Sequence, residues 1–376
     1  MKQVASPLWL SLMLLVVTPA VALAQERAAP PDVTLPAATR RAVMESLIVQ
    51  IDRGYVFPDV GTEVVKALRR HAARGDYDPI TSARAFADTL TAHLYAVAHD
   101  LHLRVHYDPD MGSGCGGPSP VAAGPAQSRM RLRNFGFERL QRLAGNVGYL
   151  DLRVFEDPAS GAGDVAAAAM GYLANCDALI VDVRRNGGGS GAMVALLITY
   201  LLEGPGRMHL FDFYFRNGSE VTVMQDWTLP YVPGPRFAGK DVYVLTSRFT
   251  GSAAESYAYA VRVGELATVV GEKTAGAGNL AGATHLLPGG FAAFVAPARV
   301  VNPITKTGWE GVGVEPNVEV PADLALREAH VRAVKALLDR ATADEDKTRL
   351  RSALEQAERT PPDPVEPPPG LRIIGR

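Results

Sequence analysis

The sequence contains only two cysteines in 376 residues, and its formal net charge at pH 7 is only −2. Two cysteines are too few for the disulfide framework of a small secreted scaffold. Lys and Arg residues are scattered, so the sequence gives no reason to expect nucleic acid as a partner. A chain of this length with 47% hydrophobic residues is instead typical of a globular protein with a sizeable core.

Long hydrophobic runs are absent except near the N-terminus. The largely apolar stretch from Leu8 to Val17 follows Lys2 and precedes small residues that end at Ala24. This order is typical of a secretory signal peptide, which we place at residues 1–24. An uncleaved anchor is the alternative, but the run is shorter than the ~20 residues that span a bilayer. We therefore expect an exported chain, periplasmic or secreted, with no stable membrane insertion after cleavage.

Export would place Cys115 and Cys176 in a compartment that permits disulfides. A bridge between them, or one loop thiol and one core residue, are both compatible with the sequence. Neither cysteine has an adjacent histidine in the chain, so nothing indicates a thiolate nucleophile.

The first part of the mature chain predicts helices. Apolar residues recur at helical spacing within 43–51, 64–68 and 86–94, and Thr81 or Ser82 can cap the third segment. We therefore predict a small helical N-terminal domain over residues 25–107. The following stretch is rich in Gly, Pro and Ser, and we assign residues 108–142 to a linker.

Residues 143–342 predict a second domain in which strands and helices alternate. The runs "CDALIVDVR", "DVYVLTS" and "ATVVGE" indicate strands, and "SGAMVALLITYLL" and "SAAESYAYAVRV" indicate helices. Such alternation is typical of an α/β domain with a mostly parallel sheet. Residues 343–376 form a charged and proline-rich C-terminal tail, in which a charged helix is followed by "TPPDPVEPPPG", a stretch that we expect to be disordered or loosely packed.

Ser252 follows the predicted strand "DVYVLTS" and a short turn, and it begins the next helix. A side chain there lies at the carboxyl end of a parallel sheet, where α/β proteins carry their sites. Free N–H groups at the helix start could stabilise an oxyanion. An ordinary N-cap is the competing interpretation, because serine is a favoured capping residue. The residues around Ser252 do not form a G-x-S-x-G elbow, since Ala254 stands at its last position.

A run of glycines, Gly187 to Gly189, follows the predicted strand "CDALIVDVR". Consecutive glycines can aim several N–H groups into one concavity, which favours an oxyanion hole or anion cradle. A plain strand-to-helix turn is the alternative, although it needs fewer glycines. Neither phosphate-loop motif is present.

Three histidines crowd into "HDLHLRVHYDP": His99, His102 and His106. If "HLRVHY" is a strand, His102, Arg104 and His106 share one face. A zinc site normally has a further strong ligand and more regular spacing, so we predict no metal here and take solvated histidines as the main alternative.

Several motifs, taken together and in this order, resemble those of the C-terminal-processing, or tail-specific, serine peptidases. They are "GYLDLRVFEDP", "CDALIVDVRRNGGGSGAMV", "VYVLTSRFTGSAAESYAYAV", "VVGEKTAGAGN" and "VVNPITKTGWEGVGVEPNVEVPADLAL". The resemblance spans about residues 36–340 and is strongest to the branch with interphotoreceptor retinoid-binding protein modules and tricorn protease. It implies a ClpP/crotonase-like β-β-α core behind the helical domain.

The resemblance also implies site residues. Ser252 corresponds to the nucleophile, in an S-A-x-E pattern with Glu255, and the N–H groups of Gly188 and Ala253 correspond to the oxyanion hole. In the branch with a Ser–Lys dyad, the lysine position is occupied here by Ala277, so that dyad is absent.

In the tricorn-like branch, His102 corresponds to the base and Glu310 to a glutamate that holds polar groups in place. The serine that precedes the histidine there is Leu101 here, so Asp100 becomes a candidate for fixing the imidazole.

The function predicted from the resemblance is that of an exported serine peptidase. It would hydrolyse peptides or unfolded proteins through an acyl-enzyme on Ser252, with His102 as base and no cofactor. The linker is too short for a PDZ domain, because ~50 residues is the low end for a domain, so the sequence gives no basis for assuming a preference for C-terminal tails. A non-catalytic module that binds hydrophobic ligands is the alternative. The combination of Ser252, His102, Glu310 and the glycine run favours the enzyme.

Overall fold

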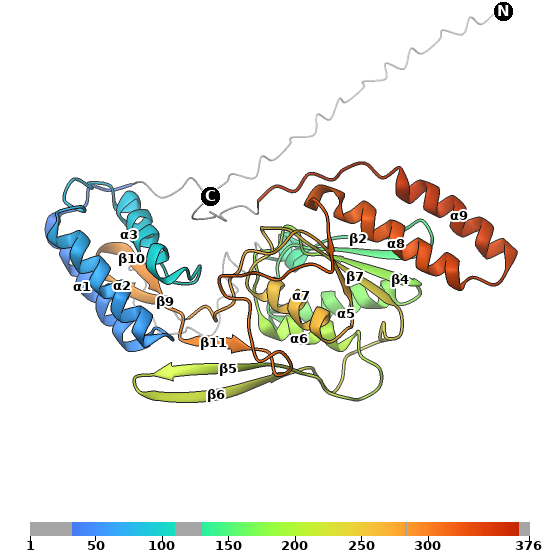
Figure 1. The fold of residues 1–376 in the computed structure, drawn as a ribbon, viewed down its shortest axis with the longest axis horizontal. Coiled ribbons are helices and arrows are strands. Elements are labelled where there is room, and N and C mark those ends of the chain that lie inside the picture. Colours follow the sequence, from blue (N-terminus) through green and yellow to red (C-terminus); the bar gives the residue numbers. More distant parts are fainter. Residues whose placement is uncertain (1–31, 110–129, 283, 368–376) are drawn as a thin grey trace, which may run out of the picture. The chain divides into compact units, whose positions relative to one another are not determined.

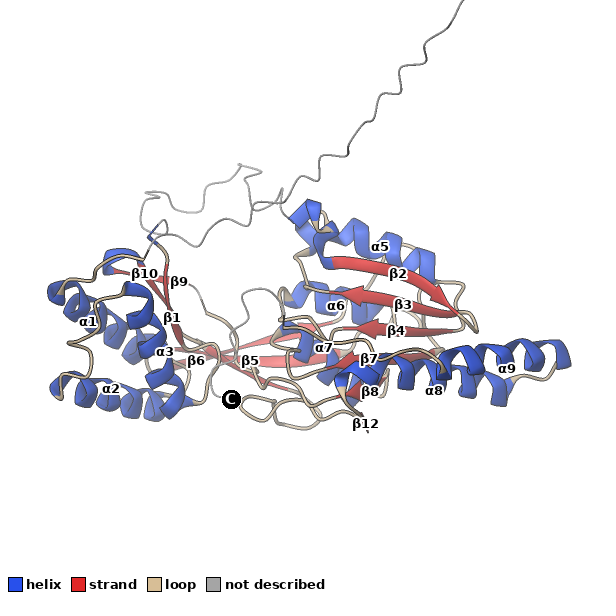
Figure 2. Ribbon diagram, turned by 90° about the horizontal axis from the view of Figure 1, so that it is seen from above, coloured by secondary structure: helices blue, strands red, loops and turns tan. Residues whose placement is uncertain are grey.

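The computed structural model describes residues 32–109, 130–282 and 284–367. A six-stranded sheet organises the later part of the chain, with the strand order β12-β8-β7-β4-β3-β2 (Figures 1 and 2). All neighbours pair in parallel except β2 with β3. The strands are β2 (Phe137–Leu143), β3 (Val147–Leu152), β4 (Ala178–Asp182), β7 (Asp241–Thr246), β8 (Thr268–Gly271) and β12 (Val318–Glu319). The predicted α/β class is confirmed.

Helices cover both faces of this sheet. Successive side chains of a strand point to opposite faces, so an apolar strand contributes side chains to two separate cores. In β4, Leu179 and Val181 belong to the core shared with three helices, whereas Ala178 and Ile180 belong to the core shared with two others. The first set is α5 (Ala162–Leu173), α6 (Gly191–Thr199) and α7 (Ala253–Val263), and the second is α8 (Ala325–Arg340) and α9 (Asp344–Glu358). A strand buried on both faces explains the unbroken apolar run in its sequence.

Three N-terminal helices form where apolar periodicity predicts them: α1 (Ala37–Gly54), α2 (Pro58–Ala73) and α3 (Ala83–Ala98). Ser82 caps α3 by accepting a hydrogen bond from the Ala85 N–H at 2.9 Å. Their core also receives side chains from a distant part of the sequence, including Phe291 and Val295. The helical region therefore incorporates a segment that the sequence assigns to the second domain.

That distant segment pairs with the strand after the helices. β1 (Arg104–Tyr107) is antiparallel to β10 (Phe291–Phe294), which is antiparallel to β9 (Thr284–Leu287). Arg104 and His106 are exposed on β1, but His102 precedes the strand and is buried. The histidines of "HLRVHY" therefore do not share one face, because the strand begins two residues later than expected.

A second three-stranded sheet, which the sequence analysis does not predict, has the order β11-β5-β6. It consists of β5 (His209–Asn217), β6 (Glu220–Trp227) and β11 (Ala298–Val301). Phe211 of β5 packs edge-on against Trp309, with ring centroids 5.4 Å apart. This contact anchors the base of the second sheet next to Glu310.

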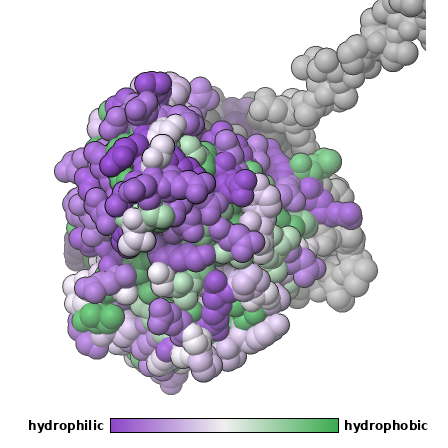
Figure 3. All heavy atoms as spheres, turned by 90° about the vertical axis from the view of Figure 1, so that its right-hand side faces the viewer, coloured by the Kyte–Doolittle hydropathy of each residue, from purple (hydrophilic) through white to green (hydrophobic). Residues whose placement is uncertain are grey.

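Two segments differ from their predicted character. The end of the predicted linker forms β2, whose side chains are mostly exposed because it is an edge strand, so the apolar signal is weak. The predicted C-terminal tail begins with the expected charged helix, α9, in which Leu350, Ala353 and Ala357 are buried. The proline-rich residues after it are tied to the sheet through Asp363. Figure 3, which views the side where α8 and α9 lie in Figure 1, shows a mainly hydrophilic surface.

Short 3₁₀ turns complete the described elements: η2 (Asn134–Gly136), η3 (Pro158–Ser160), η4 (Pro288–Gly290) and η5 (Ala322–Leu324). Among the described residues, no helix combines the length and apolar character needed to cross a bilayer. The predicted signal peptide, Cys115 and most of the linker lie outside the described residues, and Cys176 is buried in the core.

Candidate active site

Ser252 lies between β7 and α7, at the carboxyl end of the parallel sheet. It is the N-cap of α7, and its backbone has φ 53° and ψ −120°. A positive φ at a non-glycine residue is strained, and such strain gathers at functional sites. The position is therefore compatible with a helix cap and, in addition, has the backbone strain typical of a site residue.

The backbone of Gly188 packs directly against this serine. A Cβ atom placed on Gly188 would lie 2.7 Å from the Ser252 Cβ and 3.1 Å from the Ala253 nitrogen. The φ of Gly188 is 121°, a conformation that other residues rarely adopt. Only glycine fits at position 188, which explains one glycine of the run. The close approach also places Gly188 and Ala253, the two predicted oxyanion residues, beside Ser252.

The N–H groups of the two predicted oxyanion residues differ in whether they already donate a hydrogen bond. Ala253 is the first residue of α7, so its N–H has no partner within the helix. The N–H of Gly188 donates to the Asn186 side-chain oxygen at 2.9 Å. Gly188 would have to exchange this partner in order to bind an oxyanion.

Glu255 ties the serine to the loop that follows β8. Its carboxylate accepts hydrogen bonds from the Ser252 N–H at 2.9 Å, the Gly276 N–H at 2.7 Å and the Ala277 N–H at 2.8 Å. The Thr274 hydroxyl donates to the same carboxylate at 2.5 Å. Burial raises the pKa of Glu255 to about 7, against the opposing effect of these donors. The glutamate of the S-A-x-E pattern thus fixes the backbone of the candidate nucleophile.

No amine replaces the lysine of a Ser–Lys dyad in the described part of this loop. Ala277 is buried and carries no functional group. Lys273 points to Glu315 instead, with a 2.7 Å ion pair in which both side chains are about half exposed.

His102 is only 7% exposed, and burial lowers the pKa of its imidazole. Its backbone N–H donates to Asp100 Oδ1 at 2.7 Å, and Asp100 Oδ2 accepts from the Asn279 side chain at 2.9 Å. The Nδ1 atom of the imidazole is buried and has no partner among the described residues. Asp100 therefore holds the backbone of His102, while the ring itself is not oriented by it.

Glu310 approaches the histidine from the loop after Trp309. Its Oε2 accepts from the Gly278 N–H at 2.7 Å and from the Asn279 N–H. Its Oε1 is buried and, within the described ranges, unpaired. Burial, with a further contribution from Asp100, raises the pKa of Glu310 to about 8. The carboxyl group is therefore mainly protonated at neutral pH unless a further donor or a positive charge stabilises its anion.

Asp100, His102 and Glu310 form one cluster, with side-chain donor atoms within 4.8 Å of one another. These donor types could in principle hold a divalent cation. Both Asp100 oxygens and one Glu310 oxygen already accept hydrogen bonds from N–H groups, which favours a hydrogen-bonded cluster over a metal site.

One loop contacts both halves of the candidate site. The Ala277 N–H binds Glu255 beside Ser252, and the next two N–H groups bind Glu310 beside His102. Across the described residues, no hydrogen bond joins the Ser252 hydroxyl to the His102 imidazole. The loop therefore links the surroundings of Ser252 to those of His102 through hydrogen bonds to Glu255 and Glu310.

Two residues of the cluster have no counterpart in the sequence-based prediction. Asn279, at the end of "GEKTAGAGN", binds Asp100, and its only signal is a polar residue after a glycine-rich turn. Tyr55, at the end of α1, is 1% exposed, and burial together with Asp100 raises the pKa of its phenol. Nothing in its local sequence indicates a place at the site.

Comparison with known proteins gives the relatives of this arrangement. Residues 146–320 match the model of peptidase family S41, and residues 33–127 match the N-terminal domain of Peptidase_S41 in eukaryotic IRBP. A Parabacteroides merdae protein described as a peptidase is 20% identical over 82% of this chain and 98% of its own, with a TM-score of 0.52. A Streptococcus agalactiae lipoprotein is 15% identical over 80% of this chain and 98% of its own, with a TM-score of 0.50.

The photosystem II D1 C-terminal processing protease is 16% identical over 80% of this chain and 97% of its own, with a TM-score of 0.49. The Parabacteroides merdae and Streptococcus agalactiae structures show a shared fold, and the family assignment rests on the two matched domain models. These occur in the same order as the helical region and the sheet domain, and they account for most of the chain between residues 33 and 320. The chain therefore belongs to peptidase family S41 and is a serine-type peptidase.

Proposed function

We propose that Ser252 is the nucleophile of this peptidase and that the chain cleaves peptides or unfolded proteins through an acyl-enzyme. The observation that carries the proposal is the contact of the Gly188 backbone with Ser252, beside the N–H of Ala253, which has no partner within α7. A hydroxyl on a strained helix start, next to backbone N–H groups, can attack a carbonyl whose developing negative charge those groups stabilise.

His102 is the proposed general base. Its lowered pKa keeps the imidazole neutral at pH 7, so it can take the Ser252 proton and return it to the leaving amine. Water then attacks the ester, again with the imidazole as base. Hydrogen bonds of this kind often form only when substrate is bound, so the missing Ser252–His102 bond is compatible with this role.

Glu310 is the proposed partner of the imidazole. His102 Nδ1 and Glu310 Oε1 are both buried and unpaired among the described residues, and they belong to the same cluster. If Nδ1 carries the proton and donates it in a hydrogen bond to the Glu310 carboxylate, Nε2 is free to act as base. This arrangement does not need the relay serine that Leu101 replaces.

Hydrolysis of a denatured protein or a peptide library by four variants tests these roles. Ser252→Ala and His102→Ala are expected to abolish cleavage because each removes a reacting group. Ser256→Ala and His106→Ala are matched controls, since Ser256 lies one turn along α7 and His106 is exposed on β1. Cleavage that survives Ser252→Ala, or is lost equally in the controls, would contradict the proposal.

Export of the mature chain is proposed from the order of residues in the first 24 positions alone. Protein recovered from outside the cytoplasm is expected to begin at Gln25. N-terminal sequencing that finds Met1 on the exported or retained protein would contradict cleavage at this site.

A further inference from the structure

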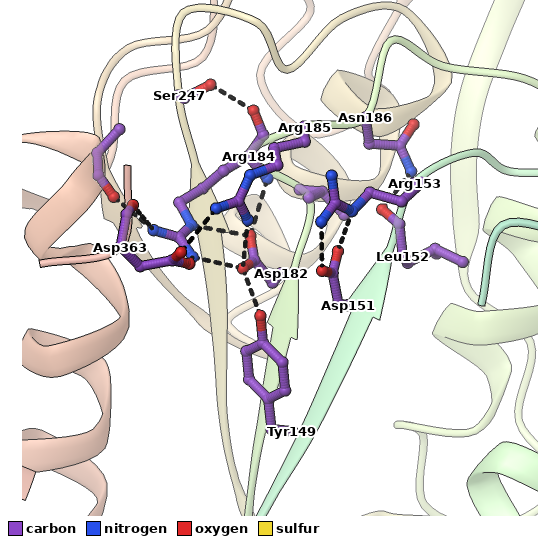
Figure 4. A network of polar contacts seen from close by, with 12 residues as sticks. Tyr149, Asp151, Leu152, Arg153, Asp182, Arg184, Arg185, Asn186, Ser247 and Asp363 are labelled. Carbon is purple, nitrogen blue, oxygen red and sulfur yellow. Dashed lines mark hydrogen bonds and ion pairs between the residues drawn. The ribbon is translucent and has the colours of Figure 1, made fainter. Parts of the chain in front are cut away.

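A buried charge network lies at the carboxyl end of β4, outside the residues of the proposed mechanism (Figure 4). The Arg184 side chain is fully buried, and Asp182 is 1% exposed. The guanidinium donates to Asp182 through Nε at 2.9 Å and through Nη2 at 2.6 Å, and the Tyr149 hydroxyl donates to the same carboxylate at 2.7 Å. A bidentate pair of this kind fixes the geometry of both side chains.

The chain returns to this network after α9. Asp363 accepts from Arg184 Nη2 at 2.6 Å and from Arg185 Nη2 at 2.9 Å, and the Pro364 carbonyl accepts from the same Arg185 group at 2.8 Å. The Asp363 N–H donates to the Asp323 carbonyl at 2.8 Å. We call residues 359–367 the C-terminal strap. Among the described residues, Asp182 and Asp363 are the two carboxylates that form ion pairs with both arginines, so the strap supplies the second negative charge.

The backbone around these arginines supports the turn that leads to Ser252. The Arg184 carbonyl accepts from the Ser247 hydroxyl at 2.5 Å, and the Val183 carbonyl accepts from the Thr250 hydroxyl at 2.8 Å. The Asn186 carbonyl accepts from the Gly251 N–H at 3.1 Å. Residues 183–188, which we call the oxyanion segment, and residues 247–251 are therefore joined by hydrogen bonds.

We propose that Asp363 is a positioning residue that, through Arg184 and Arg185, holds the oxyanion segment against Ser252. The catalytic part of this inference rests on the proposed function. The strap lies beyond residue 320, where the match to the family model ends, so it is a feature of this chain outside the matched region. Arg185 depends on it most, because its two closest side-chain hydrogen bonds both go to the strap.

The test compares Asp363→Asn with Asp241→Asn. Both carboxylates are 33% exposed and each pairs with an arginine, but Asp241 pairs with Arg340 at the opposite end of the sheet, where β7 begins. Asp363→Asn is expected to speed amide hydrogen exchange about fivefold or more in peptides covering 183–190 and 247–253, because local opening there becomes easier. Asp241→Asn is expected to leave those peptides unchanged.

Activity supplies the second readout. Asp363→Asn is expected to lower kcat by about tenfold with little change in KM, since misplaced oxyanion donors weaken binding of the transition state more than that of the substrate. Asp363→Glu is expected to recover part of the loss, whereas Asp241→Asn keeps wild-type kcat.

Unchanged exchange in both peptides, or an unchanged kcat, would overturn the inference. Faster exchange over the whole sheet domain would also overturn it, because Asp363 would then serve general stability. If the exchange changes as expected but wild-type protein shows no Ser252-dependent hydrolysis, the link between strap and segment stands and the proposed function fails.

Discussion

At the scale of single residues, the candidate site contains two buried atoms that have no hydrogen-bond partner in the described structure, His102 Nδ1 and Glu310 Oε1. An unsatisfied buried polar group costs about 1–3 kcal/mol, so such pairs are rare without a reason. Direct pairing of these two atoms would satisfy both. It would also orient the imidazole for the proposed proton transfer from Ser252. The two unpaired atoms would then cost free energy only until this hydrogen bond forms.

This pairing predicts a pH profile with two rising steps. Burial lowers the pKa of His102 below its ordinary value of 6.5, so kcat/KM rises through that lower value as the base becomes neutral. Burial raises the pKa of Glu310 to about 8, so kcat/KM rises again as pH approaches that value and the carboxylate can accept the Nδ1 proton. A kcat/KM profile measured from pH 5 to about 9 checks both steps.

The matched variant is Glu310→Gln, which cannot ionise. It is expected to retain the lower step and to lose the upper one, with a reduced maximum. An upper step that persists in Glu310→Gln would show that another group titrates there and would contradict the role of Glu310.

At the scale of elements, periodicity predicts those helices and strands whose environment is uniform along their length. The helical stripe of α1 and the apolar run of β4 each reflect burial by layers next to them. The edge strand β2 and the β5–β6 hairpin escape prediction because many of their side chains are exposed or half-buried. The role of Asp363 cannot be predicted from local sequence either, because its partners are two arginines far away in the chain.

The close contact between the oxyanion segment and the start of α7 predicts that one added methyl group at Gly188 will slow the reaction of Ser252. Gly188→Ala is expected to lower the rate of Ser252 modification by a serine-directed fluorophosphonate at least about 10²-fold, because misplacing a reacting group by ~1 Å has an effect of this size. The added Cβ at position 188 would lie 2.7 Å from the Ser252 Cβ, and the backbone φ of 121° at this position is one that alanine rarely adopts.

Gly191→Ala is the control for that substitution. Gly191 begins α6, has no positive φ, and a Cβ there would meet no atom within 4 Å. It is expected to keep the labelling rate and to stabilise the fold by up to about 1 kcal/mol. Similar labelling rates in both variants would mean that Gly188 does not border the nucleophile as described.

At the scale of the whole molecule, the parts of the site differ in how far the sequence predicts them. Ser252 and Gly188 follow neighbouring parallel strands, so the sheet order accounts for their proximity, which the sequence alone predicts only through the family resemblance. His102 reaches the site region through the pairing of β1 with β10, two segments nearly two hundred positions apart. The position of His102 at the site is expected only from the family resemblance. The positions of Asn279 and Tyr55 near Asp100 can be seen only in the folded chain.

The most direct test of the central claim is to locate the covalent adduct formed by a serine-directed fluorophosphonate. Tryptic digestion and tandem mass spectrometry would examine the peptide from Phe249 to Arg262, which contains both Ser252 and Ser256. We predict one adduct, on Ser252, that forms in wild-type protein and is strongly reduced in His102→Ala. An adduct on Ser256 or elsewhere, or no adduct on a folded wild-type protein, would contradict the assignment of Ser252 as the nucleophile.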